Sequence, residues 1–151
     1  MTGPAVRKHG VAAAALAGLL FAGCGGSSGS RSPVPVVVSG QASTWTAVTI
    51  SAEGHTVDVP SDARGDLTPL LATRALGRPA PLSEYGLDHP QATLSYRSRA
   101  GTTTDVDIGQ PNFDRHFLYV QRRGQPGVYL VAADALRPVL ALVGIEITPP
   151  E

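Results

Sequence analysis

The sequence of 151 residues holds a single cysteine, Cys24, and a single lysine, Lys8. One cysteine excludes an internal disulfide, a CxxC redox site and a zinc site built on paired cysteines. The chain also lacks an excess of charge, because 12 basic residues balance 12 acidic residues. Proteins that bind nucleic acid need a basic excess to neutralise phosphates, so the composition argues against a nucleic-acid partner.

Charged residues make up 16% of the chain and hydrophobic residues 42%. This balance is typical of a folded chain and argues against disorder. A length of 151 residues corresponds to about one domain. The 17 glycines and 13 prolines predict many turns.

The N-terminus carries a basic segment and then an apolar run. Residues 7–9 (RKH) are basic, and residues 11–23 follow without a charge. This run is short of the about 20 apolar residues that a bilayer-spanning helix needs. Its length is that of the apolar region of a secretory signal peptide.

The apolar run ends at the only cysteine. Two small residues, Ala22 and Gly23, directly precede Cys24, and this arrangement resembles the lipobox of bacterial lipoproteins. In that family the thiol takes a diacylglyceryl group and a peptidase cuts before the cysteine, which would remove residues 1–23. The family usually has Leu, Val or Ile where this chain has Phe21. Two alternatives are a secreted protein with an incidental cysteine and an uncut N-terminal anchor helix.

A linker composition follows Cys24. Residues 25–32 read GGSSGSRS, which is typical of a flexible tether. We therefore expect a lipidated cysteine and tether over residues 24–43, one domain over residues 44–144 and a C-terminal tail over residues 145–151. The chain after cleavage would carry about two more acids than bases, so the lipid and not charge would anchor it.

The domain segment combines strand and helix patterns. Helical spacing predicts a short helix from Leu67 through Ala75, with Pro69 in its first turn, and another over residues 134–143 that stops at Gly144. The pattern of period two predicts the strands, which are residues 44–51, 55–59, the two arms of a hairpin over 92–108, 117–122 and 128–131. We predict an α+β fold with a largely antiparallel sheet of about six strands and two short helices.

The register of the hairpin over residues 92–108 follows from its pattern. A three-residue loop at residues 100–102 places Tyr96 opposite Val106, so that both are buried. It also places Leu94 opposite Ile108, and Arg97 opposite Asp105 on the exposed face, where opposite charges stabilise the pair.

Four motifs in this region occur in a specific order. They are residues 84–93 (EYGLDHPQAT), 108–110 (IGQ), 117–120 (FLYV) and 127–131 (GVYLV). This order resembles the bacterial envelope family called domain of unknown function 4340, over about residues 44–144. The resemblance implies an extracytoplasmic location, often a membrane anchor, and in some members genes near ABC-type transporters. It brings no assigned catalytic residue, and the predicted first helix is shorter than is usual in the family.

The segment Tyr85-Gly86-Leu87-Asp88 also has a physical interpretation. Tyr85 and Leu87 would fill a core while Gly86 turns the chain, and Asp88 would cap the turn before Pro90. This is a structural corner. The alternative is a ligand-contacting or partner-contacting loop, so Tyr85, Leu87 and Asp88 are the candidate surface residues.

The sequence holds few candidates for catalysis. The histidines of the domain, His55, His89 and His116, lack metal-ligand spacing. Asp114 and His116 form an acid and base pair, but no nucleophile elbow accompanies them. We therefore predict no catalytic residue, no metal and no cofactor.

These features predict a lipoprotein on the outer face of the cytoplasmic membrane. We expect a non-catalytic interaction or accessory module of the cell envelope, bound to the membrane through Cys24. Its partner would be an envelope protein, with a transporter component as one candidate. The alternative is a small carrier that holds a lipid or hydrophobic ligand between sheet and helix, and a hydrolase is the third possibility.

Overall fold

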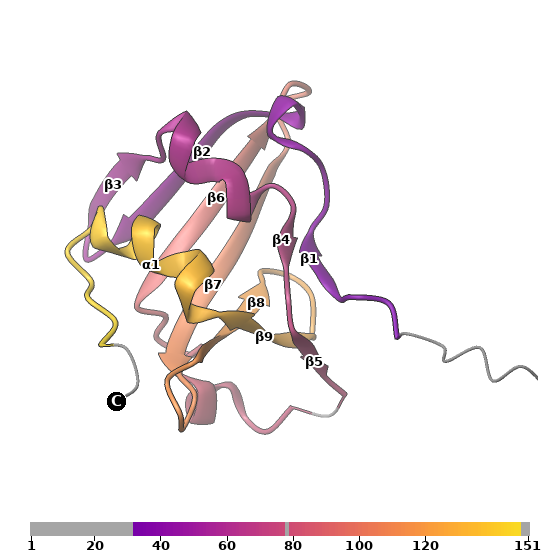
Figure 1. The fold of residues 1–151 in the computed structure, drawn as a ribbon, viewed down its shortest axis with the longest axis vertical. Helices are drawn as coiled ribbons and strands as arrows, with labels where there is room; N and C mark the ends of the chain where they lie inside the picture. The colour runs from indigo at the N-terminus through magenta and orange to yellow at the C-terminus, as the bar shows by residue number, and fades with distance from the viewer. Residues whose placement is uncertain (1–31, 78, 149–151) are drawn as a thin grey trace, which may run out of the picture. The chain divides into compact units, whose positions relative to one another are not determined.

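The computed structural model describes residues 32–77 and 79–148. Within them, seven strands form one antiparallel sheet in the order β3-β2-β6-β7-β8-β9-β5, and β1 pairs with β4 in a separate ribbon (Figure 1). The strands are β1 (Val36–Val38), β2 (Trp45–Ala52), β3 (His55–Asp58), β4 (Leu70–Leu71), β5 (Arg74–Leu76), β6 (Ala92–Ser98), β7 (Thr103–Pro111), β8 (Phe117–Arg122) and β9 (Val128–Ala132). The helical elements are the 3-10 helices η1 (Ala42–Thr44), η2 (Ser61–Leu67) and η3 (Leu82–Tyr85), and the α-helix α1 (Ala133–Ala141).

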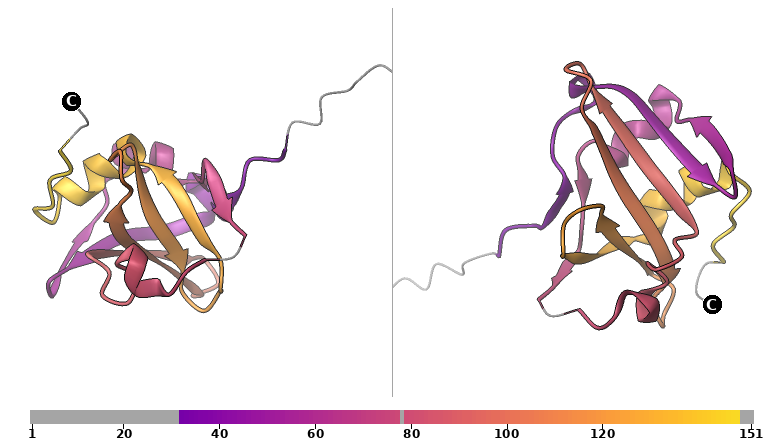
Figure 2. Two further views of the ribbon diagram at one scale, coloured as in Figure 1. Left: turned by 90° about the horizontal axis from the view of Figure 1, so that it is seen from below. Right: turned by 180° about the vertical axis from the view of Figure 1, so that it is seen from behind.

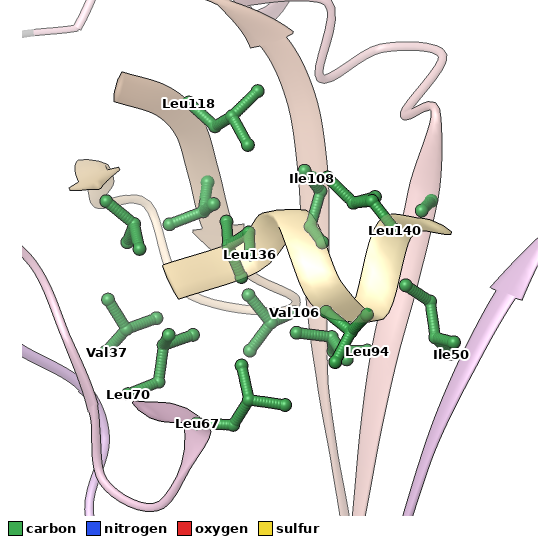
Figure 3. Close-up of a cluster of buried hydrophobic side chains, with 14 of the residues drawn as sticks. Val37, Ile50, Leu67, Leu70, Leu94, Val106, Ile108, Leu118, Leu136 and Leu140 are labelled. Atoms are coloured by element: carbon green, nitrogen blue, oxygen red, sulfur yellow. The ribbon is translucent and has the colours of Figure 1, made fainter. Parts of the chain in front are cut away.

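The main core lies between the seven-stranded sheet and two helical elements. η2 and α1 cover the same face of the sheet, and the views in Figure 2 place both on that side. Leu136 and Leu140 of α1 are 0% exposed and lie over Leu94 and Ile108 of the sheet (Figure 3). Burial of such side chains is the main stabilising contribution to a domain of this size.

Strand β6 alternates buried and more exposed residues, whereas β7 has four consecutive buried residues, Val106 to Gly109. Tyr96 of β6 is 0% exposed, and its hydroxyl donates a hydrogen bond to the carbonyl oxygen of Leu67 at 3.2 Å. The Trp45 ring meets the Tyr96 ring edge to face at 5.4 Å between centroids. Burial raises the pKa of the Tyr96 hydroxyl, because the interior disfavours its charged form.

All six predicted strands are present, and three further strands were not predicted: β5 adds to the main sheet, and β1 and β4 form the separate ribbon. The additional strands β1, β4 and β5 are only two or three residues long, too short for a pattern of period two to reveal them. The coarse prediction of an α+β fold with a largely antiparallel sheet is confirmed.

The predicted hairpin register is wrong by two residues. Tyr96 pairs with Thr104 and Leu94 with Val106, so Arg97 faces Thr103 instead of Asp105. The loop between β6 and β7 explains this difference in register.

The three-residue loop is Arg99-Ala100-Gly101, one position earlier than predicted. Gly101 occupies its last position with φ 83°. Such loops close with a residue in the left-handed conformation, which glycine adopts at least cost. A shift of two residues keeps every side chain on its predicted face, so Leu94 and Val106 are still buried.

The predicted helix from Leu67 through Ala75 is also wrong. The helical element here is η2, which ends at Leu67, and the next residues form β4 and β5. Pro69 follows the helix and does not sit in its first turn, because a proline disfavours helical geometry in the residue before it. Thr68 accordingly has φ −136° and ψ 85°.

The second helix agrees with the prediction. α1 covers Ala133–Ala141, and Leu136, Val139 and Leu140 form its buried face. Gly144 follows with φ 77°, and the N–H of Ile145 donates to the carbonyl of Leu140 at 3.0 Å. A left-handed glycine after the last turn is a common helix end.

The folded part extends beyond residues 44–144 at both ends. Val37 and Val38 of β1 are 3% and 1% exposed, so part of the predicted tether belongs to the core. Ile147, in the predicted tail, is 7% exposed and joins the same core. The predicted signal peptide, Cys24 and the start of the tether lie outside the described residues.

Candidate functional site

The candidate surface of Tyr85, Leu87 and Asp88 forms a turn after η3. Gly86 ends this 3-10 helix in the left-handed conformation with φ 66°. The N–H of Leu87 donates to the carbonyl of Leu82 at 3.0 Å and closes the turn. Glycine at this position allows the reversal, which directs Leu87 back to the sheet.

This turn packs directly against Gly109 of β7. A Cβ atom at Gly109 would overlap the carbonyl oxygen of Tyr85 and would lie 3.1 Å from the Leu87 side chain. A residue without a side chain is therefore required for the turn to approach the strand. The motif of residues 108–110 and the motif of residues 84–93 thus meet at this point.

Tyr85 is held in place at both ends of its side chain. Its ring stacks at a tilt on the Tyr119 ring, with 4.7 Å between centroids. Its hydroxyl oxygen accepts a hydrogen bond from the N–H of Ala80 at 2.8 Å. A second bond fixes the same turn, because the Gln110 amide donates to the carbonyl of Glu84 at 2.6 Å.

These contacts define what a partner could touch at the corner. Leu87 is 5% exposed and Tyr85 is half-buried, so both mainly support the fold. Asp88 is exposed, and its carboxylate accepts a hydrogen bond from the N–H of His89 at 3.0 Å. The accessible part of the predicted surface is therefore Asp88 and the rim of Tyr85.

A polar network lies on the opposite face of the sheet from α1, where the sequence predicted an ion pair of Asp105 with Arg97 and did not predict the part of Arg123. Arg123 follows β8, and its guanidinium donates to Asp105 at 3.2 Å and through Nε to Asp107 at 3.1 Å. The Nη2 group also bonds Asp107. From β6, the Ser95 hydroxyl donates to Asp105 at 2.6 Å and the Thr93 hydroxyl to Asp107 at 2.9 Å.

This network joins β6 and β7 through hydroxyl-to-carboxylate hydrogen bonds, and joins β7 to the end of β8 through the ion pairs of Arg123. Asp107 is 8% exposed, whereas about half of the Arg123 side chain is exposed. The hydrogen bond with Asp107 raises the pKa of Arg123, so the guanidinium stays protonated. Because both carboxylates are engaged by one guanidinium, the arrangement fits a structural role better than an acid and base pair.

The predicted pair of Asp114 and His116 is joined through the backbone of His116. The Asp114 carboxylate accepts a hydrogen bond from the backbone N–H of His116 at 3.0 Å, and this bond lowers the pKa of Asp114. It is a local turn contact in the loop between β7 and β8, where Arg115 has φ 59°. Both side chains are exposed at the surface.

Metal-binding residues do not gather within residues 32–77 and 79–148. His55, His89 and His116 are exposed on three separate segments. In this part of the chain no group of three His, Cys, Asp or Glu residues could hold a metal ion.

A surface hollow of about 390 Å³ lies between β4 and the start of α1. Its apolar lining comes from Val34, Pro69, Leu71, Ala72, Ala132 and Ala135. Gly65, Asp66 and Thr73 complete the wall.

The helices of the described residues include none long and apolar enough to cross a membrane.

Comparison with known proteins identifies a family but no annotated relative. No curated protein and no solved structure matches the chain. Residues 66–141 match the family described as Domain of unknown function (DUF4340). These residues include η3, the turn at Gly86, Gly109 and the Arg123 network. The chain belongs to the DUF4340 family.

Proposed function

We propose that the protein is a lipoprotein anchored through Cys24 to the outer face of the cytoplasmic membrane. Its domain would act there as a non-catalytic interaction or accessory module of the cell envelope. The observation that carries the anchor is the place of the only cysteine, at the end of the apolar run and directly after Ala22 and Gly23. A diacyl group holds a protein stably on a bilayer, whereas one chain binds weakly.

The engagement of the charged side chains supports a binding role over catalysis. Arg123 donates hydrogen bonds to both Asp105 and Asp107, and the Asp114 carboxylate bonds the backbone of His116. General acid and base catalysis needs such groups to be free to exchange a proton with a substrate. Here their hydrogen bonds stabilise strands and turns.

The filled core supports an interaction module over a lipid carrier. A carrier of the predicted kind would hold its ligand between the sheet and α1. Leu94, Leu136 and Leu140 occupy this space and are each 0% exposed. Recognition would then use the surface, with Asp88 at the corner as the candidate contact.

Anchoring makes a weak surface contact effective. A short tether holds the domain close to neighbouring membrane proteins and raises its effective concentration toward them. An envelope protein, such as a transporter component, is therefore the proposed partner.

Cross-linking in native bacterial membranes tests the proposal. The wild-type protein should give a defined cross-linked species, and Asp88→Ala should reduce its yield at equal protein level. Asp62→Ala is the matched control, since Asp62 is an exposed acid on η2, and its cross-linking should match the wild type. Turnover of ester or peptide substrates that disappears in His116→Ala would instead identify a hydrolase and overturn the proposal.

A further inference from the structure

Three exposed hydrophobic side chains gather on the ribbon of β1 and β4. Val34, Val36 and Leu71 are 61%, 47% and 45% exposed. Val36 and Leu71 are direct partners across the two strands, and Val34 lines the same hollow as Leu71. We call Val34, Val36 and Leu71 the ribbon patch.

The ribbon patch borders a concave apolar surface. The hollow of about 390 Å³ beside it is lined largely by small apolar residues, among them Pro69, Ala72 and Ala135. Exposed apolar side chains around such a hollow are typical of a site that receives an apolar partner. Other large hydrophobic residues exposed in the described part of the chain are on separate elements, namely Leu82, Phe113 and Leu142.

The position of the patch along the chain favours the membrane surface as that partner. Val34 follows Cys24 by about 10 residues, and a flexible coil of that length spans roughly 17 Å. β1 is the first strand of the described chain, and β4 lies beside it (Figure 1). A lipid on Cys24 would therefore hold the patch near the bilayer surface.

Charge argues for an apolar contact with that surface. After cleavage the chain would hold about two more acids than bases, which disfavours electrostatic attraction to anionic lipid. Around the patch, Asp66 lines the hollow and Arg74 lies just after β4, so the local charges have opposite signs. Apolar side chains that enter the interfacial region supply the remaining attraction.

We propose that the ribbon patch of Val34, Val36 and Leu71 docks on the lipid surface of the membrane that holds Cys24. This proposal rests on the proposed lipid anchor. It orients the domain with the β1–β4 ribbon toward the bilayer and the β3 edge of the sheet away from it, since β4 leads directly into β5, which is the edge strand opposite β3 (Figure 1).

Paramagnetic broadening of methyl signals tests the orientation. The mature protein is inserted by its lipid into phosphatidylcholine nanodiscs that contain a gadolinium-chelating lipid. We expect loss of the methyl signals of Val34, Val36 and Leu71, while the methyl signals of Val57 on β3 persist. Equal loss at all four residues, or at none of them, would overturn the docking proposal.

Two variants, and a series of nanodiscs with different numbers of protein copies per disc, complete the test. The double change Val36→Asp and Leu71→Asp should restore the Val34 signal without releasing the protein, because both positions are exposed and Cys24 is intact. The control His55→Asp, at an exposed site on β3, should keep the wild-type pattern. If the loss of the Val34, Val36 and Leu71 methyl signals changes with the number of protein copies per disc, a second copy of the chain occupies the patch, and the proposal is overturned.

This design distinguishes a failure of the proposed anchor from a failure of the docking proposal. If bacteria leave the Cys24 thiol unmodified, the proposed anchor is wrong, and that thiol is then coupled to a maleimide lipid in the same nanodiscs. The loss of signals at the ribbon patch is measured on this chemically anchored chain, with the same expected and contradicting results.

Discussion

Gly109 shows how one missing side chain lets two distant sequence motifs meet, residues 84–93 and residues 108–110. Its Cα faces the turn of Tyr85 and Leu87, and a Cβ there would overlap the Tyr85 carbonyl oxygen. We predict that Gly109→Ala lowers the free energy of unfolding by about 1–3 kcal/mol, because either the turn or the strand must shift. Urea denaturation of the purified protein measures this change.

Gly65→Ala is the matched control for Gly109→Ala. A Cβ at Gly65 would meet nothing within 4 Å, and Gly65 lies in η2. Its replacement should leave stability within about 0.5 kcal/mol. Equal losses in the two variants would refute the close approach at Gly109.

Tyr96 makes stability depend on pH in the alkaline range. Burial raises the pKa of Tyr96 in the folded protein, whereas the unfolded chain keeps the ordinary value of about 10. Above that pH the unfolded state loses the proton first, so stability falls as pH rises. Tyr96→Phe should cost about 1 kcal/mol at neutral pH through loss of the bond to Leu67.

The pH test compares the slopes of the two proteins. Denaturation midpoints measured from pH 8 to about 11 should fall less steeply in Tyr96→Phe than in the wild type. Parallel curves would show that Tyr96 titrates alike in the folded and unfolded states, which its burial contradicts.

At the scale of elements, β7 is held between β6 and β8 by the Arg123 network. Arg123→Ala leaves the carboxylate of Asp107, which is 8% exposed, without its cation. We predict a loss of about 1–3 kcal/mol in the free energy of unfolding. Arg97→Ala should cost less than about 0.5 kcal/mol, because Arg97 is exposed and faces Thr103.

Thermal or urea denaturation of both variants checks this order. A larger loss in Arg97→Ala would favour the register in which Arg97 pairs with Asp105. Adding Asp107→Asn to Arg123→Ala should recover part of the loss, since it removes the unpaired charge.

The hairpin of β6 and β7 also shows what sequence patterning can resolve. Alternation placed Leu94, Tyr96 and Val106 on the core face, where they are buried. It could not separate registers that differ by two residues, because both keep the same face. The position of Gly101 at the end of the loop was the available signal, and it also determines which arginine meets Asp105.

The helix predicted for the segment after η2 was wrong for a different reason. Leu67, Leu70 and Leu71 match the spacing of a helix face, yet Leu70 and Leu71 form β4. A strand of two residues is stabilised by its partner β1, which is distant in sequence, and not by local pattern. The corner at Tyr85–Asp88 was predictable, since Gly86 and the alternating apolar residues mark a turn within one short segment.

At the scale of the whole molecule, the proposed anchor and the folded domain are separated by a short segment. The first described strand, β1, begins at Val36, ahead of the predicted domain start at residue 44, so a tether from Cys24 would be shorter than predicted. A shorter tether confines the domain more closely to the bilayer and restricts which neighbours it reaches. The proposed envelope interaction and the proposed membrane docking both depend on this confinement.

Mass spectrometry of the mature N-terminus, from protein extracted from bacterial membranes, tests the central claim most directly. The account predicts that the chain begins at Cys24, that residues 1–23 are absent and that Cys24 carries a diacylglyceryl group. Cys24→Ser should abolish both the acyl mass and the cleavage. A chain that still begins at Met1, or a free Cys24 thiol in the membrane fraction, would contradict the account.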